Sequence, residues 1–335
     1  MAQAVVPKRF GVSPRRVSGS TVAAMGHPDD EFHPPTSDDP YWTETCWFTF
    51  TVPERRLSGQ LYPFFRPNQH VAAGAAYFWD ERGSQPWNCV YGKNFWHLPM
   101  PASPLSDIAL PNGIRYRCVE PLTKYEIAYA DPDGGDEIDV ALTFTAVAQP
   151  NYLGAAHLDQ PGRYQGTIRL HDEVIAVDSY GFRDRSWGPR TQFGQGLGST
   201  PAECGGYSYA TSSVADGFHA ITMDFGAGCQ AIHGYIVREG LWGKVTTGTR
   251  RVLQRDDATG APTRVVLRLT DEHGRDIEAT GRAVNRFGVH LNPNLFTWNC
   301  LTEWIFDGIE AWGEDHDNWS AAAARKFFRG QLGYA

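Results

Sequence analysis

The chain has 335 residues, of which 41% are hydrophobic, 13% aromatic and 20% charged, and its net charge is −8. This aromatic content excludes a disordered chain, and the mild acidity argues against nucleic acid as a partner, because phosphate binding needs clustered Lys and Arg. No window reaches the roughly 20 apolar residues of a membrane span.

Residues 1–40 are rich in Pro, Ser, Arg and Asp and predict an irregular arm. The start of this arm lacks the apolar core of a secretory signal, so a cytoplasmic location is expected. The segment "GHPDDEF" at Gly26 to Phe32 resembles the metal-binding signature of zinc-dependent sugar deacetylases. It follows a poor strand and runs at once into Pro34 and Pro35, so we interpret it as part of a solvated arm.

From Tyr41 onward, short aromatic segments alternate with turns rich in Gly, Pro and Asp, a pattern typical of strands. Residues 48–83 resemble residues 207–240, since both run strand, turn, strand, turn, strand and end in an acidic-Gly turn. We therefore expect an all-β sandwich or barrel built from two modules. The expected modules are residues 41–156 and 157–335.

One helix is predicted, over "SAAAARKFFRGQL" near the C-terminus, with Asn318 or Ser320 as its N-cap. We interpret the preceding "GEDHDN", Gly313 to Asn318, as an acidic turn whose charges suit a helix N-terminus. The six cysteines are scattered without a Cys-x-x-Cys pair, which favours buried small hydrophobes over a zinc site or redox couple.

The segment "SYGFRDRSWGPR", Ser179 to Arg190, contains a carboxylate between two guanidiniums, with aromatic rings around them. In a strand, alternation places Tyr180, Phe182, Asp184 and Ser186 on one face. Arg183, Arg185 and Trp187 then lie on the other. A carboxyl group that shares an apolar face with rings has a raised pKa, as a general acid near neutral pH requires. The alternative is an Asp–Arg lattice that only ties the strand to its neighbours.

A second dense segment is "HLDQPGRYQG", in which His157 and Asp159 alternate onto one side. His157 could orient a carboxylate or carry a proton, or it could be a hydrogen-bonded structural residue. Glu44 and Glu303 lie beside tryptophans and are further candidate buried carboxylates. Most aromatic residues are expected in the core, and some, such as Trp47, could line a ligand cavity.

At these two segments the sequence resembles the carotenoid 1,2-hydratase and AttH-like family. "GFRDRSWG" is similar to the family signature Gly-x-x-Asp-His-x-Trp/Tyr-Gly, and "HLDQPGRYQG" to a His-x-Glu-Gln segment one hairpin earlier. The resemblance covers residues 157–190 most clearly and extends to the aromatic strands between Tyr41 and Asp80. It implies paired lipocalin-like β modules with an apolar pocket, an activity without cofactors or metal, and isoprenoid or polyketide substrates.

Carried over by position, the resemblance makes Asp184 the proton donor to an alkene and His157 its partner. Two departures stand out, because the motif histidine is Arg185 here and the expected tyrosine is Phe182. The upstream glutamate is replaced by the shorter Asp159. The predicted substrate-binding residues comprise aromatic side chains that would shield a cation and the polar residues near them: Trp187, Phe182, Tyr180, Trp47, Glu44, Arg183 and Arg185.

The sequence thus favours a cofactor-free hydratase, dehydratase, isomerase or cyclase for an apolar, terpenoid-like small molecule. The alternative is a carrier that binds such a ligand in the same cavity without chemistry. A third hypothesis is a carbohydrate enzyme that pairs two of the carboxylates Glu44, Asp184 and Glu303. A homodimer remains open.

Overall fold

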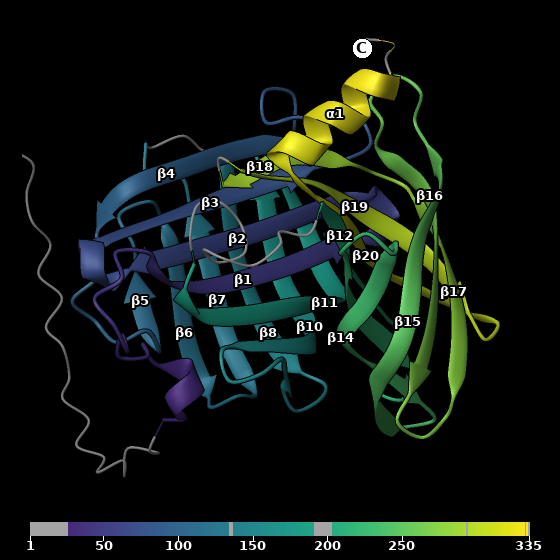
Figure 1. The fold of residues 1–335 in the computed structure, drawn as a ribbon. Helices are drawn as coiled ribbons and strands as arrows, with labels where there is room; N and C mark the ends of the chain where they lie inside the picture. The colour runs from purple at the N-terminus through teal and green to yellow at the C-terminus, as the bar shows by residue number, and fades with distance from the viewer. Residues whose placement is uncertain (1–25, 134–136, 191–202, 293, 332, 334–335) are drawn as a thin grey trace, which may run out of the picture.

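A computed structural model describes residues 26–133, 137–190, 203–292, 294–331 and 333 of the chain. These residues form a curled β-sheet and a closed β-barrel that lie side by side, with one α-helix across the barrel end (Figure 1). The all-β, lipocalin-like prediction with a short C-terminal helix is confirmed. None of the described helices is long and apolar enough to cross a membrane.

The curled sheet contains eleven antiparallel strands in the order β4-β3-β2-β1-β11-β10-β8-β7-β6-β5, with β9 beside β10. The strands are β1 (Trp42–Val52), β2 (Leu57–Arg66), β3 (Val71–Trp79), β4 (Tyr91–Pro99), β5 (Asp107–Ala109), β6 (Ile114–Glu120), β7 (Lys124–Ala130), β8 (Ile138–Ala146), β9 (Asn151–Tyr152), β10 (His157–Leu170) and β11 (Glu173–Pro189). Short 3-10 turns at Pro53–Arg55 and Pro67–Gln69 join the first three strands.

The inner face of this sheet is packed with aromatic side chains, among them Phe48, Phe50, Phe144 and Tyr164. Close packing explains the first glycine of the "GFRDRSWG" segment, Gly181. A Cβ on Gly181 would lie 2.5 Å from the Thr49 carbonyl oxygen and 2.8 Å from the Tyr164 ring. The Tyr164 hydroxyl in turn donates to the Phe182 carbonyl oxygen at 2.7 Å, which ties β10 to β11.

The barrel is formed by eight strands in the order β12-β13-β14-β15-β16-β17-β19-β20, closed between β20 and β12, with β18 beside β19. Its elements are β12 (Cys204–Thr211), β13 (Gly217–Asp224), β14 (Cys229–Arg238), β15 (Leu241–Arg255), β16 (Pro262–Asp271), β17 (Asp276–Ala283), β18 (Phe287–Asn292), β19 (Leu295–Phe306), β20 (Ile309–Ser320) and the helix α1 (Ala321–Gln331). The Ser320 hydroxyl accepts a hydrogen bond from the Ala323 amide at 3.3 Å, so Ser320 is the helix N-cap.

The curled sheet and the barrel meet through the outer faces of their strands. Trp47 of β1 and Phe182 of β11 pack against Tyr207 and Tyr209 of β12. The Thr49 hydroxyl donates to Glu314 of the barrel at 2.7 Å. We call this contact region the seam.

The expected modules do not coincide with the two sheets. Strands β10 and β11 follow residue 156 but pair with β8 and β1, so residues 157–189 belong to the curled sheet. The reason is that β11 returns beside the first strand and joins the two halves of the curled sheet. The chain near residue 156, where the module boundary was expected, is a turn between β9 and β10 of the same sheet.

Two segments interpreted as solvent-exposed polar structure contain buried carboxylates instead. "GHPDDEF" includes a 3-10 turn at Pro28–Asp30, and buried Asp30 accepts hydrogen bonds from the Tyr125 hydroxyl at 2.7 Å and the Leu122 amide at 2.9 Å. "GEDHDN" belongs to strand β20, where Asp315 and Asp317 point into the barrel. In both cases, specific donors compensate for the burial of the carboxylates.

The donor that the two barrel carboxylates share is Arg250 of β15, which is itself 4% exposed. Its Nε and Nη2 lie 2.9 and 2.6 Å from the two oxygens of Asp315, and its Nη1 lies 3.1 Å from Asp317. Ser208 donates to the same Asp315 oxygen as the Arg250 Nε, at 2.7 Å. This group replaces part of an apolar barrel core with a charge network.

Replacing Asp315 with Asn should therefore destabilise the protein by about 3–5 kcal/mol, because it leaves a buried guanidinium only partly compensated. The free energy of unfolding in urea measures this loss. Glu278→Gln is the matched control, since it neutralises an exposed pair with Arg268 at 2.7 Å and should cost at most about 1 kcal/mol. Equal losses in the two variants would contradict the structural importance of the buried pair.

Candidate active site at the seam

Strand β11 places Asp184 on the seam and its two neighbouring arginines inside the curled sheet. Asp184 lies opposite Trp47 of β1 and Asp159 of β10 in the strand register. Phe182 on the same face packs in the seam, as the alternation predicts. Tyr180 lies four residues from Asp184, which is about 13 Å along the strand.

The inward arginines have partners within the curled sheet. Arg183 Nε donates to Gln160 at 2.6 Å, and its guanidinium lies 4.1 Å from the centre of the Tyr125 ring. Arg185 forms a buried ion pair with Glu44 at 2.6 Å. The sheet itself therefore separates Arg183, Arg185 and Glu44 from Asp184.

Two other predicted residues also lie away from Asp184. The Trp187 indole stacks on His33, with ring centres 3.9 Å apart, on the same side as Arg185. Glu303 pairs with Arg282 on the outside of the barrel. Of the predicted substrate-binding residues, the structure brings Trp47 and Phe182 to the seam beside Asp184.

The carboxylate of Asp159 is fully buried beside Asp184 and is surrounded by histidines. One oxygen lies 3.0 Å from His157 Nε2, 3.1 Å from His233 Nε2 and 3.8 Å from His219 Nδ1. The other oxygen accepts a hydrogen bond from the Tyr207 hydroxyl. Three of these partners come from the barrel, so Asp159 is a direct polar link across the seam.

These contacts fix the charge of Asp159. Burial alone would raise its pKa, but the neighbouring His157 and His219, together with the close imidazole of His233, hold the pKa well below its usual range. His157 responds in the opposite way. Burial disfavours its charged form, yet Asp159 outweighs burial and raises the pKa of His157. The two residues thus favour an imidazolium–carboxylate pair.

His157 is oriented from both ring nitrogens. Its Nδ1 lies 2.6 Å from the Ser186 hydroxyl, while Nε2 faces Asp159. Ser186 is two residues from Asp184 on the same face of β11. A ring nitrogen of His157 and a carboxylate oxygen from each of Asp159 and Asp184 all lie within 4.8 Å of one another. The histidine is therefore held within reach of both carboxylates.

Asp184 has the opposite electrostatic environment from Asp159. Burial among the rings of the seam raises its pKa to about 6, with Asp159 acting in the same direction and His157 opposing. Its side chain keeps partial access to solvent. A carboxyl group in this state can both donate and accept a proton near neutral pH.

The barrel contributes residues that the sequence analysis did not identify. His219 is fully buried between the rings of Phe182 and Tyr207, and burial lowers its pKa to about 3 despite the nearby Asp159. The His316 ring packs against Trp47, and its Nε2 lies 3.0 Å from a carboxylate oxygen of Glu314. In the sequence, these residues stand out only as polar side chains within strands that are otherwise rich in aromatic residues.

Three groups of described side chains offer ligand atoms for a metal ion: His157, Asp159 and Asp184, as noted above, and two others. Asp159, His219 and His233 bring donor atoms within 4.8 Å of one another, and two histidines with one carboxylate form a set that transition metals accept. Cys204, Asp224 and Cys229 form the third group, at one end of the barrel. All six cysteines of the chain are described, and each is a free thiol.

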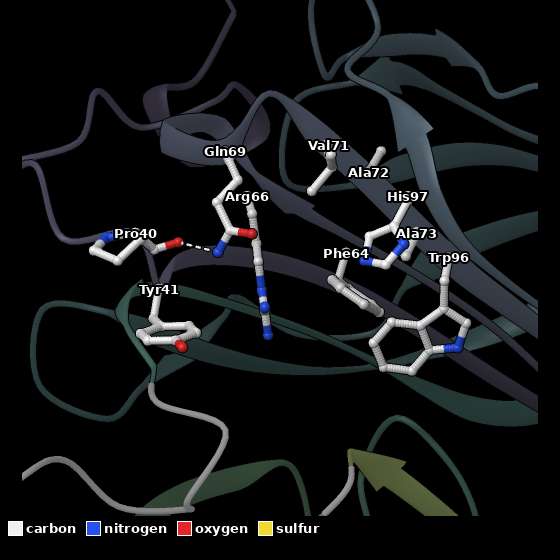
Figure 2. A pocket seen from close by; sticks show the side chains of 10 residues that line it. All are labelled: Pro40, Tyr41, Phe64, Arg66, Gln69, Val71, Ala72, Ala73, Trp96 and His97. Atoms are coloured by element: carbon white, nitrogen blue, oxygen red, sulfur yellow. Dashed lines mark hydrogen bonds between the residues drawn. The ribbon is translucent and has the colours of Figure 1, made fainter.

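A hollow of about 280 Å³ opens on the outer face of the curled sheet (Figure 2). Aromatic rings form its walls, and Arg66 and His97 bring nitrogen atoms to it. Phe64, which lines the hollow, pairs with Thr45, and Thr45 pairs with Ser186. The hollow therefore lies on the same sheet face as Asp184, two strands away.

This pairing of a curled sheet with a lipocalin-like barrel is the class of fold that the sequence resemblance implied. The chain belongs to the family described as Domain of unknown function (DUF7064), which matches residues 26–319. A comparison with curated proteins found no match to this sequence.

Two solved structures share the fold. A provisional AttH protein (NE1406) from Nitrosomonas europaea is 14% identical, with a TM-score of 0.60, and the match covers 89% of this chain and 98% of that protein. Kievitone hydratase from Nectria haematococca is 10% identical, with a TM-score of 0.50, covering 91% and 96%. The predicted resemblance to the hydratase and AttH-like proteins is confirmed at the level of the fold.

Replacing Asp159 with Asn should lower the pKa of His157 by roughly one unit or more, because it removes the charge that favours the imidazolium. Histidine ring NMR over a pH titration measures the shift, with the His157→Gln spectrum assigning the signal. Glu126→Gln, which neutralises an exposed carboxylate paired with Arg117, should leave His157 unchanged. An unaltered His157 titration in Asp159→Asn would contradict the proposed charge coupling.

Proposed function

We propose that this protein is a cofactor-independent hydro-lyase, a hydratase or dehydratase, for an apolar and terpenoid-like substrate. The observation that carries the proposal is the position of Asp184, a half-buried carboxyl group with a pKa of about 6 on the ring-lined seam. The fold shared with kievitone hydratase, whose name states a hydration reaction, supports the same reaction class. The proposed setting is the cytoplasm.

In the hydration direction, the protonated Asp184 transfers its proton to one carbon of a substrate double bond. The π electron pair forms the new C–H bond, a carbocation remains on the other carbon, and Asp184 becomes a carboxylate. Water then adds to the cation and loses a proton to Asp184, which restores the acid. Dehydration follows the same steps in reverse, with Asp184 protonating the leaving hydroxyl.

The surroundings of Asp184 suit this chemistry. Trp47, Phe182 and Tyr207 present ring faces and edges in the seam, and ring faces stabilise a nearby cation. His157 is held between Asp159 and Ser186, and in the proposal it orients Asp184 and the attacking water. The same rings restrict the access of bulk water to the site, which limits capture of the cation at the wrong carbon.

A carrier for an apolar ligand is the second candidate function, since the seam rings would also bind a ligand without chemistry. The compound that co-purifies with the protein, identified by mass spectrometry, serves as the probe for both candidates. Incubation of this compound with the protein in D₂O separates them, because a passive carrier cannot place deuterium on carbon. Incorporation at an alkene carbon supports the hydro-lyase.

Asp184→Asn should reduce deuterium incorporation by about 10²–10⁴-fold, because the amide keeps the shape of the side chain but has no acidic proton. Asp178→Asn is the control, since Asp178 lies on the same strand and pairs with Arg163 at the surface. Dialysis of the wild-type protein against EDTA should leave the rate unchanged. Incorporation at the native rate in Asp184→Asn would refute the assignment.

The pH dependence of exchange should follow the protonation of Asp184. The acid form delivers the proton, so kcat/KM should be highest below about pH 6 and fall tenfold for each pH unit above it. Deuterium incorporation measured from about pH 5 to pH 8 tests this profile. A rate that stays constant across this range, or that increases with pH, would exclude Asp184 as the acid.

A further inference from the structure

Arg66 at the end of β2 is a cation without an anionic partner among the residues that the structure describes. Its guanidinium lies over the rings of Tyr41 and Phe64, 5.5 and 5.8 Å from their centres. The buried Nε has no hydrogen-bond acceptor in the described part of the chain. Tyr41, Phe64 and Arg66 all line the hollow shown in Figure 2.

The Arg66 side chain is half-buried, and its Nε is enclosed without an acceptor among the described residues. Burial lowers the pKa of Arg66, which means that the protein destabilises the charged form rather than compensating for it. The buried arginines Arg250 and Arg185, by contrast, each have a carboxylate acceptor. A cation left without an acceptor is expected where a ligand supplies the anion.

The opposite wall of the hollow is shaped by an irregularity in β4. The pairing of β3 with β4 shifts register between Ala72 and Gly74, and His97 there has a left-handed backbone with φ of 56°. Such bulges redirect side chains and are common beside binding sites. Figure 2 shows His97 and Trp96 turned toward the same space as Phe64.

The hollow lies close enough to Asp184 for one elongated molecule to reach both. Phe64, Thr45 and Ser186 form one row across three neighbouring strands, which places Phe64 about 10 Å from Ser186. Tyr62 lies two residues from Phe64 along β2, on the same face, and contributes with Phe64 to a smaller adjoining hollow. This part of the face carries aromatic side chains and Arg190, which interacts with Tyr62 and Asp184, and Arg66 lies at its far end.

We propose that the Arg66 hollow binds the anionic end, a carboxylate or a phosphate, of an elongated apolar substrate whose reacting carbon lies beside Asp184. The planar guanidinium of Arg66 offers paired donors to two oxygens of such a group, and His97 provides a further nitrogen. The rings of Tyr41, Phe64 and Trp96 contact the adjoining apolar body. The inference rests on the proposed function for the position of the substrate, but the binding of an anion can be tested without turnover.

The probes are decanoate, decyl phosphate and decan-1-ol, which share one apolar chain and differ in the head group. Calorimetry at about pH 8, below the concentrations at which the probes aggregate, should show decanoate or decyl phosphate binding roughly tenfold or more tightly than decan-1-ol. Tighter binding of decyl phosphate identifies a phosphate end, and tighter binding of decanoate a carboxylate end. Equal affinities for all three probes would overturn the proposal.

Arg66→Gln should remove the preference for the charged probes, whereas Arg115→Gln, at an exposed position on β6, should retain it. A preference that persists in Arg66→Gln would also overturn the proposal. If Arg66→Gln does not fold, Arg66→Lys should still weaken decanoate binding several-fold, because Lys lacks the planar fork. Fluorescence quenching by decanoate that is lost in Trp96→Phe places the probe in this hollow, and unchanged quenching excludes it.

Asp184→Asn separates this inference from the proposed function. The variant should keep the tighter binding of charged probes while it loses deuterium exchange. Arg66→Gln should show the converse, with exchange retained at saturating substrate and KM raised roughly tenfold or more. Loss of exchange at saturation in Arg66→Gln, in a protein that still folds, would contradict a role limited to binding.

Discussion

Alternation along β11 separates opposite charges onto the two faces of the curled sheet, and the chemistry of the seam depends on this separation. Arg183 and Arg185 point inward to Gln160 and Glu44, while Asp184 points outward. His157, Arg190 and His316 act to lower the pKa of Asp184, but burial outweighs them. A guanidinium directly beside Asp184 on the same face would lower the pKa by about one to three units more and leave a carboxylate that cannot donate a proton. The register that prevents this is fixed on both sides, by β1 and β10.

The filled interiors of both β units explain why the candidate site lies between them. The curled sheet encloses the rings of Tyr116, Tyr125 and Tyr164, and the barrel encloses an apolar cluster and the Arg250 network. A lipocalin-like barrel often holds its ligand inside. Here the side chains occupy that space, and the outer strand faces form the ring-lined surface instead. The resemblance in fold therefore did not by itself locate the site.

The sequence predicted those parts of the site that depend on local pattern. Alternation and the family signature led to Asp184 and His157, because both lie in dense motifs on single strands. His219, His233 and Tyr207 are different, since they come from barrel strands and reach Asp159 only through the packing of one β unit on the other. Strand alternation describes which face a residue is on, but not what that face packs against.

The same limit explains the polar segments that were interpreted as exposed. Asp30 and Asp315 look like surface residues until Tyr125 and Arg250, far away in sequence, supply their hydrogen bonds. The two carboxylates of the seam follow this logic with opposite results. Asp159 is surrounded by polar partners and stays ionised. For Asp184, its direct neighbour in the register, burial outweighs the nearby positive charges, so this carboxyl group holds its proton more tightly. Adjacent acids whose pKa values are driven apart can divide acid and orienting roles between them. Because three of the four polar partners of Asp159 come from the barrel, the packing of the two β units contributes to that difference.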